Sequence, residues 1–397
     1  MKLIKAYKYR LKTGPKDEIT LVRFTGCSRF VWNRALSFQK ELLDSGRRCL
    51  SYEPLTLQLP VWKKEFPFLK DVHSQILQQR LKELCRAIDA AFDPADAREF
   101  PKFKKKHKST ASFRYPQGFK LNGNCVFLPK IGWMRFYRSR DIEGTPKNCT
   151  VSKRGQHWYI SVQTEMDVAA PVHTSSSFAG ADMGVRNTLT MSDGTTYRAA
   201  KSSGEMSLKL AAMQRKLFRM VRGSNNWKKQ KLKINRLHVR IADMRKDRLH
   251  KVSSVVSKNH AVLVLEDLKV RNMSASAKGT VDKPGKNVKR KSALNRFILD
   301  QGWYELRRQI EYKMSWRGGH VIFVHPAGTS RTCSCCGHVS PENRPSQALF
   351  YCVKCGHTEN ADVNAAKIIL GAGQALLACG SNGVAKPSEA GTVQKLH

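Results

Sequence analysis

Four cysteines near the C-terminus have the spacing of a metal site. They form two Cys-x-x-Cys pairs separated by fifteen residues. Thiolates three positions apart can bind one ion when the chain turns tightly, and Gly337 and Gly356 directly follow the pairs and permit such turns. Four thiolate ligands give a closed tetrahedral site, so we predict one structural Zn²⁺ ion. The predicted ligands are Cys333, Cys336, Cys352 and Cys355.

An iron–sulfur site or a set of free thiols is the alternative for these cysteines. Cys335 beside Cys336 makes the register ambiguous, but only Cys333 gives the two-residue spacing to Cys336. The other six cysteines are scattered and the total of 11 is odd, which argues against a disulfide framework and fits a reducing compartment. We interpret these six as core or neutral positions.

Three acidic residues occupy positions that suit catalysis. Asp182 and Glu266 each end an apolar stretch, and Asp362 opens an apolar helical run seven residues after the last cysteine of the cluster. Two Mg²⁺ ions that bridge a scissile phosphate need several anionic oxygen ligands in one place. A single such acid would more often be a solvated residue at a strand end. Three together predict a magnesium-dependent catalytic site.

The charge of the chain indicates its partner. The 397 residues include 71 Lys+Arg against 31 Asp+Glu, a formal net charge of +40. Phosphodiester backbones are the usual partners of such an excess, and a membrane surface is the alternative. No stretch approaches the roughly 18 apolar residues of a spanning helix, and the N-terminus shows no signal peptide. We predict a cytoplasmic, nucleic-acid-binding protein without a membrane partner.

Three segments concentrate this charge. Ser207–Lys251 has 15 basic residues against two acids, which favours phosphate contact over a merely solvated face. Arg271–Lys291 is rich in Lys, Gly and Ser and is predicted to be a mobile loop. The slightly longer segment Arg271–Arg296 has eight basic residues to one acid and could close over a substrate strand. Pro101–Lys120 has seven basic residues and no acid. Its aromatic residues could equally stack on unpaired bases or belong to the core. They are Phe103, Phe113, Tyr115 and Phe119.

Alternation and helical periodicity divide the N-terminal half. The first dozen residues alternate polar and apolar and predict a strand. Residues 16–92 have apolar positions at helical spacing and predict three or four helices. Short strands return from about residue 100, so we expect a small β-barrel interrupted by a helical domain. A polar linker, Pro171–Ser177, follows.

The C-terminal half begins with a strand that ends in Asp182. A hairpin with an Asp193-Gly194 turn comes next, then two long helices around residues 210–220 and 234–252. A buried strand follows and ends in Glu266.

Seven motifs in this order resemble TnpB, a family of transposon-encoded RNA-guided DNA endonucleases related to type V CRISPR effectors. They are Cys27–Leu36, Pro101–Lys104, Leu128–Gly132, Gly180–Asn187, Leu265–Leu268, Thr329–Cys333 and Ala361–Ala366. The resemblance covers nearly the whole chain, and its mild departures are Met183, where leucine is commoner, and the extra Cys335.

The resemblance implies a multidomain α/β and α+β protein. Its expected parts are a wedge-like β-barrel (1–15 and 93–172), a helical recognition domain (16–92), a RuvC nuclease domain of RNase H-like fold (178–327 and 359–385), an inserted zinc ribbon (328–358) and a flexible tail (386–397). Asp182, Glu266 and Asp362 fall on the catalytic acids of the family.

The implied mechanism is guided cleavage of DNA. A guide RNA would pair with one strand of double-stranded target DNA while the protein recognises a short adjacent motif. The three acids would hold two Mg²⁺ ions, one activating water and the other stabilising the leaving oxygen. Arg331 is a candidate contact to the scissile phosphate, and a monomer on the RNA is expected. The alternatives are an unguided structure-selective nuclease and a nucleic-acid-binding regulator of transposition that does not cleave.

Overall fold

The computed structural model describes residues 1–95, 98–106, 109–198, 202–280 and 282–380. The described residues divide into two compact units, Met1–Val168 and the chain from Ala169 onward. The predicted tail, 386–397, lies outside the described residues. Within these ranges, none of the helices combines the length and apolarity that a bilayer crossing requires.

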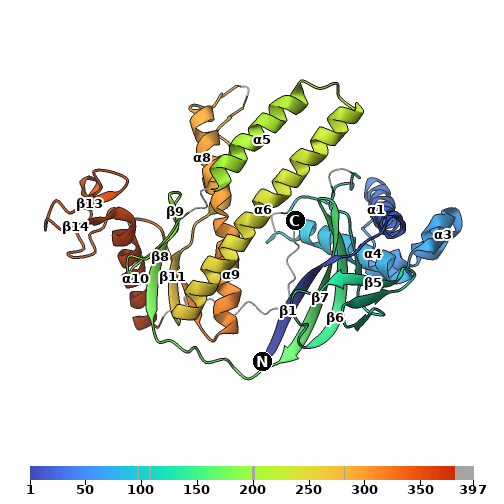
Figure 1. The fold of residues 1–397 in the computed structure, drawn as a ribbon, viewed down its shortest axis with the longest axis horizontal. Helices are drawn as coiled ribbons and strands as arrows, with labels where there is room; N and C mark the ends of the chain where they lie inside the picture. Colours follow the sequence, from blue (N-terminus) through green and yellow to red (C-terminus); the bar gives the residue numbers. More distant parts are fainter. Residues whose placement is uncertain (96–97, 107–108, 199–201, 281, 381–397) are drawn as a thin grey trace. The chain divides into compact units, whose positions relative to one another are not determined.

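The first unit contains a seven-stranded antiparallel sheet (Figure 1). Its strands are β1 (Lys2–Leu11), β2 (Ser112–Tyr115), β3 (Lys120–Asn122), β4 (Cys125–Leu128), β5 (Gly132–Tyr137), β6 (Thr145–Arg154) and β7 (His157–Asp167). The order β2-β6-β7-β1-β5-β4-β3 places the first strand at the centre, between two later ones. The predicted N-terminal strand and the later short strands are therefore confirmed. The two ends of the order, β2 and β3, are the edges of the sheet.

The predicted helical insert is confirmed between β1 and β2. It consists of α1 (Pro15–Asp44), α2 (Tyr52–Thr56), α3 (Gln58–Glu65), the 3₁₀ helix η1 (Pro67–Asp71) and α4 (Ser74–Phe92). Proline at the first position of α1 suits a helix start, because its missing N–H would have no partner there. The apolar stripe of α1 is buried, and Phe24 meets Phe113 of the sheet at a ring distance of 5.6 Å.

The aromatic residues of Pro101–Lys120 do not share one role. Phe113 and Tyr115 are buried in the core of the first unit, so base stacking is excluded for them in this structure. Phe119 is half-buried against the same core, whereas Phe103 is 45% exposed with the Lys40 ammonium over its ring.

The second unit contains a five-stranded sheet with the order β10-β9-β8-β11-β12. Its strands are β8 (Phe178–Asp182), β9 (Asn187–Met191), β10 (Thr196–Arg198), β11 (Val262–Glu266) and β12 (His320–Val324). Strands β8, β11 and β12 are parallel, and β9 and β10 are antiparallel. The predicted hairpin is confirmed: the Asp193 carboxylate accepts a hydrogen bond from the Thr195 N–H at 2.8 Å, and Gly194 has a φ of +87°.

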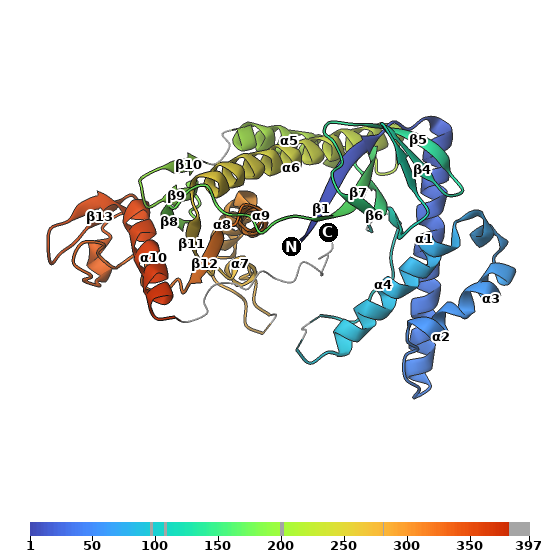
Figure 2. The ribbon, with the colours of Figure 1, turned by 90° about the horizontal axis from the view of Figure 1, so that it is seen from below.

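Both faces of this sheet are covered by helices. Leu263 and Leu265 pack with α6 (Asn225–Asn259), α8 (Val288–Gln301) and α9 (Trp303–Trp316), whereas Val264 packs with Ile369 of α10 (Ala361–Ala378). Figures 1 and 2 show α10 on one face and α6 and α9 on the other. Because side chains alternate along a strand, Gly180 and Asp182 of β8 lie on the α10 face.

The sequence reasoning missed three elements and misjudged one loop. Helices α8 and α9 and strand β12 were not predicted, and the expected loop Arg271–Lys291 is shorter than expected. Its first residues belong to α7 (Val270–Met273), and α8 already begins at Val288. Lysine and arginine are good helix formers, so a basic composition does not by itself indicate a loop.

Gly180 sets how closely α10 approaches the sheet, and its replacement gives a first prediction. A Cβ at Gly180 would meet the Ala366 carbonyl oxygen at 2.1 Å and the Leu370 nitrogen at 2.6 Å. Both are backbone atoms, so we expect Gly180→Ala to displace α10 and lower the free energy of unfolding by roughly 1–3 kcal/mol. Gly371→Ala on α10 is the control, because its Cβ meets nothing within 4 Å and Ala favours a helix. Urea unfolding measures both; equal stability of the two variants would contradict the prediction.

Candidate functional site

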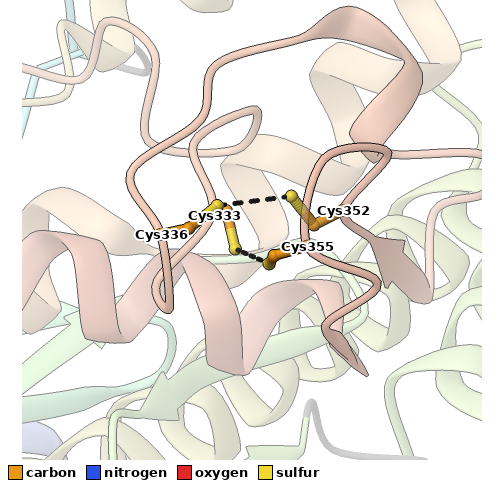
Figure 3. Close-up of side chains that lie close together, drawn as sticks. All are labelled: Cys333, Cys336, Cys352 and Cys355. Atoms are coloured by element: carbon orange, nitrogen blue, oxygen red, sulfur yellow. Dashed lines mark hydrogen bonds between the residues drawn. The ribbon is translucent and has the colours of Figure 1, made fainter.

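The four predicted cysteines converge. Their Sγ atoms all lie within 4.8 Å of one another, with Cys333 and Cys355 3.7 Å apart and Cys336 and Cys352 3.6 Å apart (Figure 3). Each pair spans a tight turn that ends on a glycine with a φ of +73°, as the sequence predicted. Cys335 is exposed and outside the cluster, so the preferred register is the one the structure adopts.

The environment of Cys352 favours a thiolate ligand. Burial opposes ionisation of this thiol, but hydrogen bonds from the backbone of Cys355 and Lys354 and from the side chains of Cys355 and Cys336 together outweigh burial and lower the pKa of Cys352 to about 6. A thiolate, and not a thiol, is the form that binds metal.

A buried asparagine joins the two cysteine turns. The Asn343 amide donates to the carbonyls of Arg331 and His338 at 2.9 and 3.0 Å, and its oxygen accepts from the Val353 N–H at 3.0 Å. Only short elements lie within residues 328–360, all of which the structure describes. They are η2 (Pro341–Asn343), β13 (Leu349–Tyr351) and β14 (Thr358–Asn360). With so small a core, this module (residues 328–360) depends on cross-links among its turns.

The module is fastened to the helix that carries Asp362. Asn364 is buried; its oxygen accepts from the Ser334 N–H at 2.9 Å, and its amide donates to the Thr332 carbonyl at 2.8 Å. Asn360 caps α10 by accepting from the Asp362 N–H at 3.0 Å. The start of α10, and with it Asp362, is therefore held between the cysteine module and the sheet.

In the structure the three predicted acids lie close enough for the charges of Glu266 and Asp362 to affect the pKa of Asp182. Strands β8 and β11 are parallel with Ala181 opposite Leu265, so Asp182 and Glu266 follow side by side at their carboxyl ends. Burial, and then the charges of Glu266 and Asp362, raise the pKa of Asp182 to about 7. Of the residues the structure describes, only the cysteines have ligand atoms all within 4.8 Å of one another, so the carboxylates are spaced more widely.

Glu266 is 7% exposed and is held by a threonine. The Thr329 hydroxyl donates to the Glu266 carboxylate at 2.6 Å. Burial raises the pKa of Glu266, and this hydrogen bond opposes the rise. Thr329 lies four residues before Cys333, so the segment that enters the cysteine module also orients a carboxylate of the sheet.

Removing this hydroxyl gives a second prediction. Thr329→Val keeps the shape but leaves Glu266 without its donor, so the pKa of Glu266 should rise further. For the magnesium-dependent cleavage that the sequence predicts, we expect the rate to fall by about 10- to 100-fold, with more Mg²⁺ needed and the pH profile moved to higher pH. Thr329→Ser keeps the hydroxyl and is the control. Magnesium titrations of cleavage at several pH values measure the effect; a Val variant with an unchanged magnesium requirement would refute the role.

Arg344 is a charged residue of the site that the sequence reasoning missed. Its Nη2 lies 3.7 Å from the Asp362 carboxylate, and its charge lowers the pKa of Asp182. In the sequence, the one indication of Arg344 was its place in the long interval between the two cysteine pairs.

Arg331, which was predicted, has an exposed side chain, and its contact to phosphate stays a prediction. Asp267 is engaged elsewhere, in ion pairs with Lys269 and Arg307 at 2.5 and 2.6 Å.

Three family models match the chain. Residues 1–48 match a "Helix-turn-helix domain", residues 161–277 a "Probable transposase", and residues 303–369 a "Cas12f1-like, TNB domain". Residues 1–48 are all described and form one strand and one long helix, so the structure has no helix-turn-helix within that first match.

Relatives match the whole length. The chain is 53% identical over 96% of its length to "Putative RNA-guided DNA endonuclease InsQ" of Escherichia coli, covering 95% of that protein. It is 33% identical over 95% of its length to "Putative RNA-guided DNA endonuclease" of Streptomyces pristinaespiralis, covering 91% of it. A solved Cas12f1–sgRNA–target DNA complex matches 93% of the chain at 17% identity with a TM-score of only 0.35, so the assignment depends on the sequence relatives. The chain belongs to the TnpB family.

Proposed function

We propose that this protein is an RNA-guided DNA endonuclease that hydrolyses phosphodiester bonds of target DNA with Mg²⁺. The observation that carries the proposal is the concentration of negative charge around Asp182, whose pKa is raised to about 7 by burial and by two neighbouring carboxylates despite the opposing charge of Arg344. The names of the full-length relatives agree with this activity.

The carboxylates fit divalent cations. Three hard anionic groups lie on one side of a sheet, and burial together with the charges of the other two opposes the ionisation of Asp182. Divalent cations would stabilise such a group of carboxylates. Asp182, Glu266 and Asp362 are the residues that would hold two Mg²⁺ ions. When bound, such ions lower the pKa of a water nucleophile and neutralise charge on the phosphate.

The remaining residues of the site have roles that follow from their contacts. Thr329 fixes the orientation of Glu266, and the Asn360 cap with Asn364 fixes the start of α10. Arg344 is a cation next to Asp362, where it can contact a phosphate that enters the site. The four cysteines would hold a structural Zn²⁺ ion, which would cross-link the turns of the module that carries Arg344.

The finer domain assignments belong to this proposal. The sheet of the first unit would be the wedge-like barrel, and residues 16–92 the recognition domain. The order β10-β9-β8-β11-β12, with an antiparallel meander followed by parallel strands, supports an RNase H-like, RuvC-type nuclease domain. Residues 328–358 would be its zinc-ribbon insert.

The net charge of +40 supports the partners, a guide RNA and double-stranded target DNA. Sequence choice would be delegated to base pairing with the guide. A monomer on the RNA and a cytoplasmic location remain predictions.

Sequencing the RNA that co-purifies with the protein tests the proposal. The protein is expressed beside its native flanking DNA, and the recovered RNA is used to programme cleavage of a matching duplex in Mg²⁺. We expect one discrete RNA whose end directs cutting. Random RNA fragments with cutting that ignores the guide would favour the structure-selective nuclease. A discrete RNA with guided binding but no cutting would favour the regulator of transposition.

A further inference from the structure

The turn between α5 (Ser202–Phe218) and α6 exposes an aromatic residue that the fold does not use. Phe218, the last residue of α5, is 94% exposed, and Val221 in the turn is 79% exposed. Figures 1 and 2 show the two helices as an antiparallel hairpin whose turn lies far from the five-stranded sheet. A phenylalanine that is almost completely exposed loses the favourable free energy of burial, so the turn is a candidate for a contact with a partner.

The turn is held in place. The Ser224 hydroxyl caps α6 by accepting from the Trp227 N–H at 3.2 Å, and Gly223 has a φ of +89°. Across the hairpin, the buried Gln230 amide donates to the Met213 carbonyl at 3.1 Å. Phe218 is therefore displayed on a preorganised turn, which lowers the entropy lost when a partner binds.

The charge around the turn indicates the class of partner. Residues 206–242 contain 11 Lys and Arg and no acidic residue. Arg219 and Arg222, on either side of Val221, are exposed. A second protein surface would have to be strongly acidic to match this hairpin, whereas a nucleic acid supplies phosphates and flat bases together.

We propose that this hairpin tip, Phe218–Arg222, binds an unpaired base of the guide RNA. Phe218 stacks on the base, while Arg219 and Arg222 contact the flanking phosphates. RNA is favoured over target DNA because RNA loops and ends present unstacked bases, whereas the bases of duplex DNA are enclosed. The inference rests on the proposed function, since it assigns a contact to the guide RNA of that activity.

Affinity for the RNA recovered with the wild-type chain tests the contact. We expect Phe218→Ala to weaken binding by about 5- to 100-fold, the range for loss of one stacked base. Phe218→Trp should retain binding, and Phe218→Leu should lose it, because leucine is apolar but cannot stack as a π system. Leu208→Ala is the matched control, since Leu208 is also exposed (74%) on α5 but ten residues from the tip. A fully paired RNA duplex should bind all variants equally.

A photocrosslinker locates the base. Benzoylphenylalanine introduced at position 218 should crosslink to unpaired nucleotides of the RNA, and the same group at position 208 should not. Unchanged RNA affinity of Phe218→Ala overturns the proposal, and a loss confined to target DNA reassigns the tip to DNA. The RNA-binding result does not depend on cleavage, because Asp182→Asn should bind RNA normally. A wild-type chain that binds RNA through Phe218 but does not cut DNA would refute only the proposed function.

Discussion

Asp182→Asn should abolish DNA cleavage and at the same time stabilise the protein in magnesium-free buffer. The asparagine cannot supply the anionic oxygen that a divalent cation needs, so we expect the cleavage rate to fall by at least about a hundredfold. The gain in stability arises because the wild-type carboxylate is largely withdrawn from water near Glu266 and Asp362, and the positive charge of Arg344 offsets only part of the resulting rise in its pKa. Asparagine has nearly the same shape and no charge, so it removes the repulsion.

The pH dependence of this gain follows from the pKa of Asp182, which is about 7 in the folded state against an ordinary value of 3.8. Between these values the folded chain holds a proton that the unfolded chain has released, so wild-type stability falls as pH rises through this window. Each pKa unit corresponds to about 1.4 kcal/mol, so the cost reaches roughly 4 kcal/mol above pH 7. The variant escapes this cost, and its advantage should vanish near pH 4.

Urea unfolding at pH 4, 6 and 8 measures the difference between variant and wild type. Magnesium should be omitted and not chelated, because a chelator would also strip zinc. Asp193→Asn is the matched control: it is the same substitution at an exposed turn residue, and it should change stability little at any pH. Added Mg²⁺ should stabilise the wild type more than Asp182→Asn. A variant that is no more stable than wild type at pH 8 would contradict the crowding of charge in this site.

The sequence predicted the residues of the site better than the contacts that position them. Asp182 and Glu266 could be identified because each ends a short apolar strand, and the cysteines because of their spacing. Asn364 and Thr329 lie inside two of the family motifs, but neither spacing nor a strand end indicates what they do. Their roles appear only when the cysteine module folds back on α10 and β11. Arg344 was missed for the same reason: an arginine inside a loop becomes part of the site only through its distance to Asp362.

The fold shows the same limit. Alternation and helical spacing identified β1, α1 and α4, whose buried faces are mostly apolar. Helix α8 was read as part of a loop because four of its first nine residues are Lys or Arg, and only Ile298 and Gln301 of that helix are buried. Phe113 and Tyr115 could not be assigned to core or surface until the strands β2 and β6 were paired. Burial of an aromatic residue depends on tertiary packing that local patterns do not contain.

Cys352→Ser should release zinc and remove cleavage while leaving RNA binding intact. A serine hydroxyl is a poor ligand for Zn²⁺, and the module has only a small core around Phe350 to replace the lost cross-link. Zinc binding of this type contributes folding free energy directly, on the order of 10 kcal/mol in isolated metal-dependent modules. Without the ion, the turns that present the Ser334 N–H and the Thr332 carbonyl to Asn364 should lose their order.

Loss of zinc should disturb the arrangement of the carboxylates in two ways. Arg344 would no longer be held beside Asp362, and the start of α10 would lose its contacts with the module. The 11 basic residues of 206–242 lie outside the module, so affinity for RNA should be retained.

Cys335→Ser is the matched control, because Cys335 is adjacent and exposed but outside the cluster. Elemental analysis should find one zinc per chain in that control and less than one in Cys352→Ser. Full zinc content in Cys352→Ser would show that the ligand set is wrong, whereas zinc loss with undiminished cleavage would show that the module does not position Arg344 and Asp362.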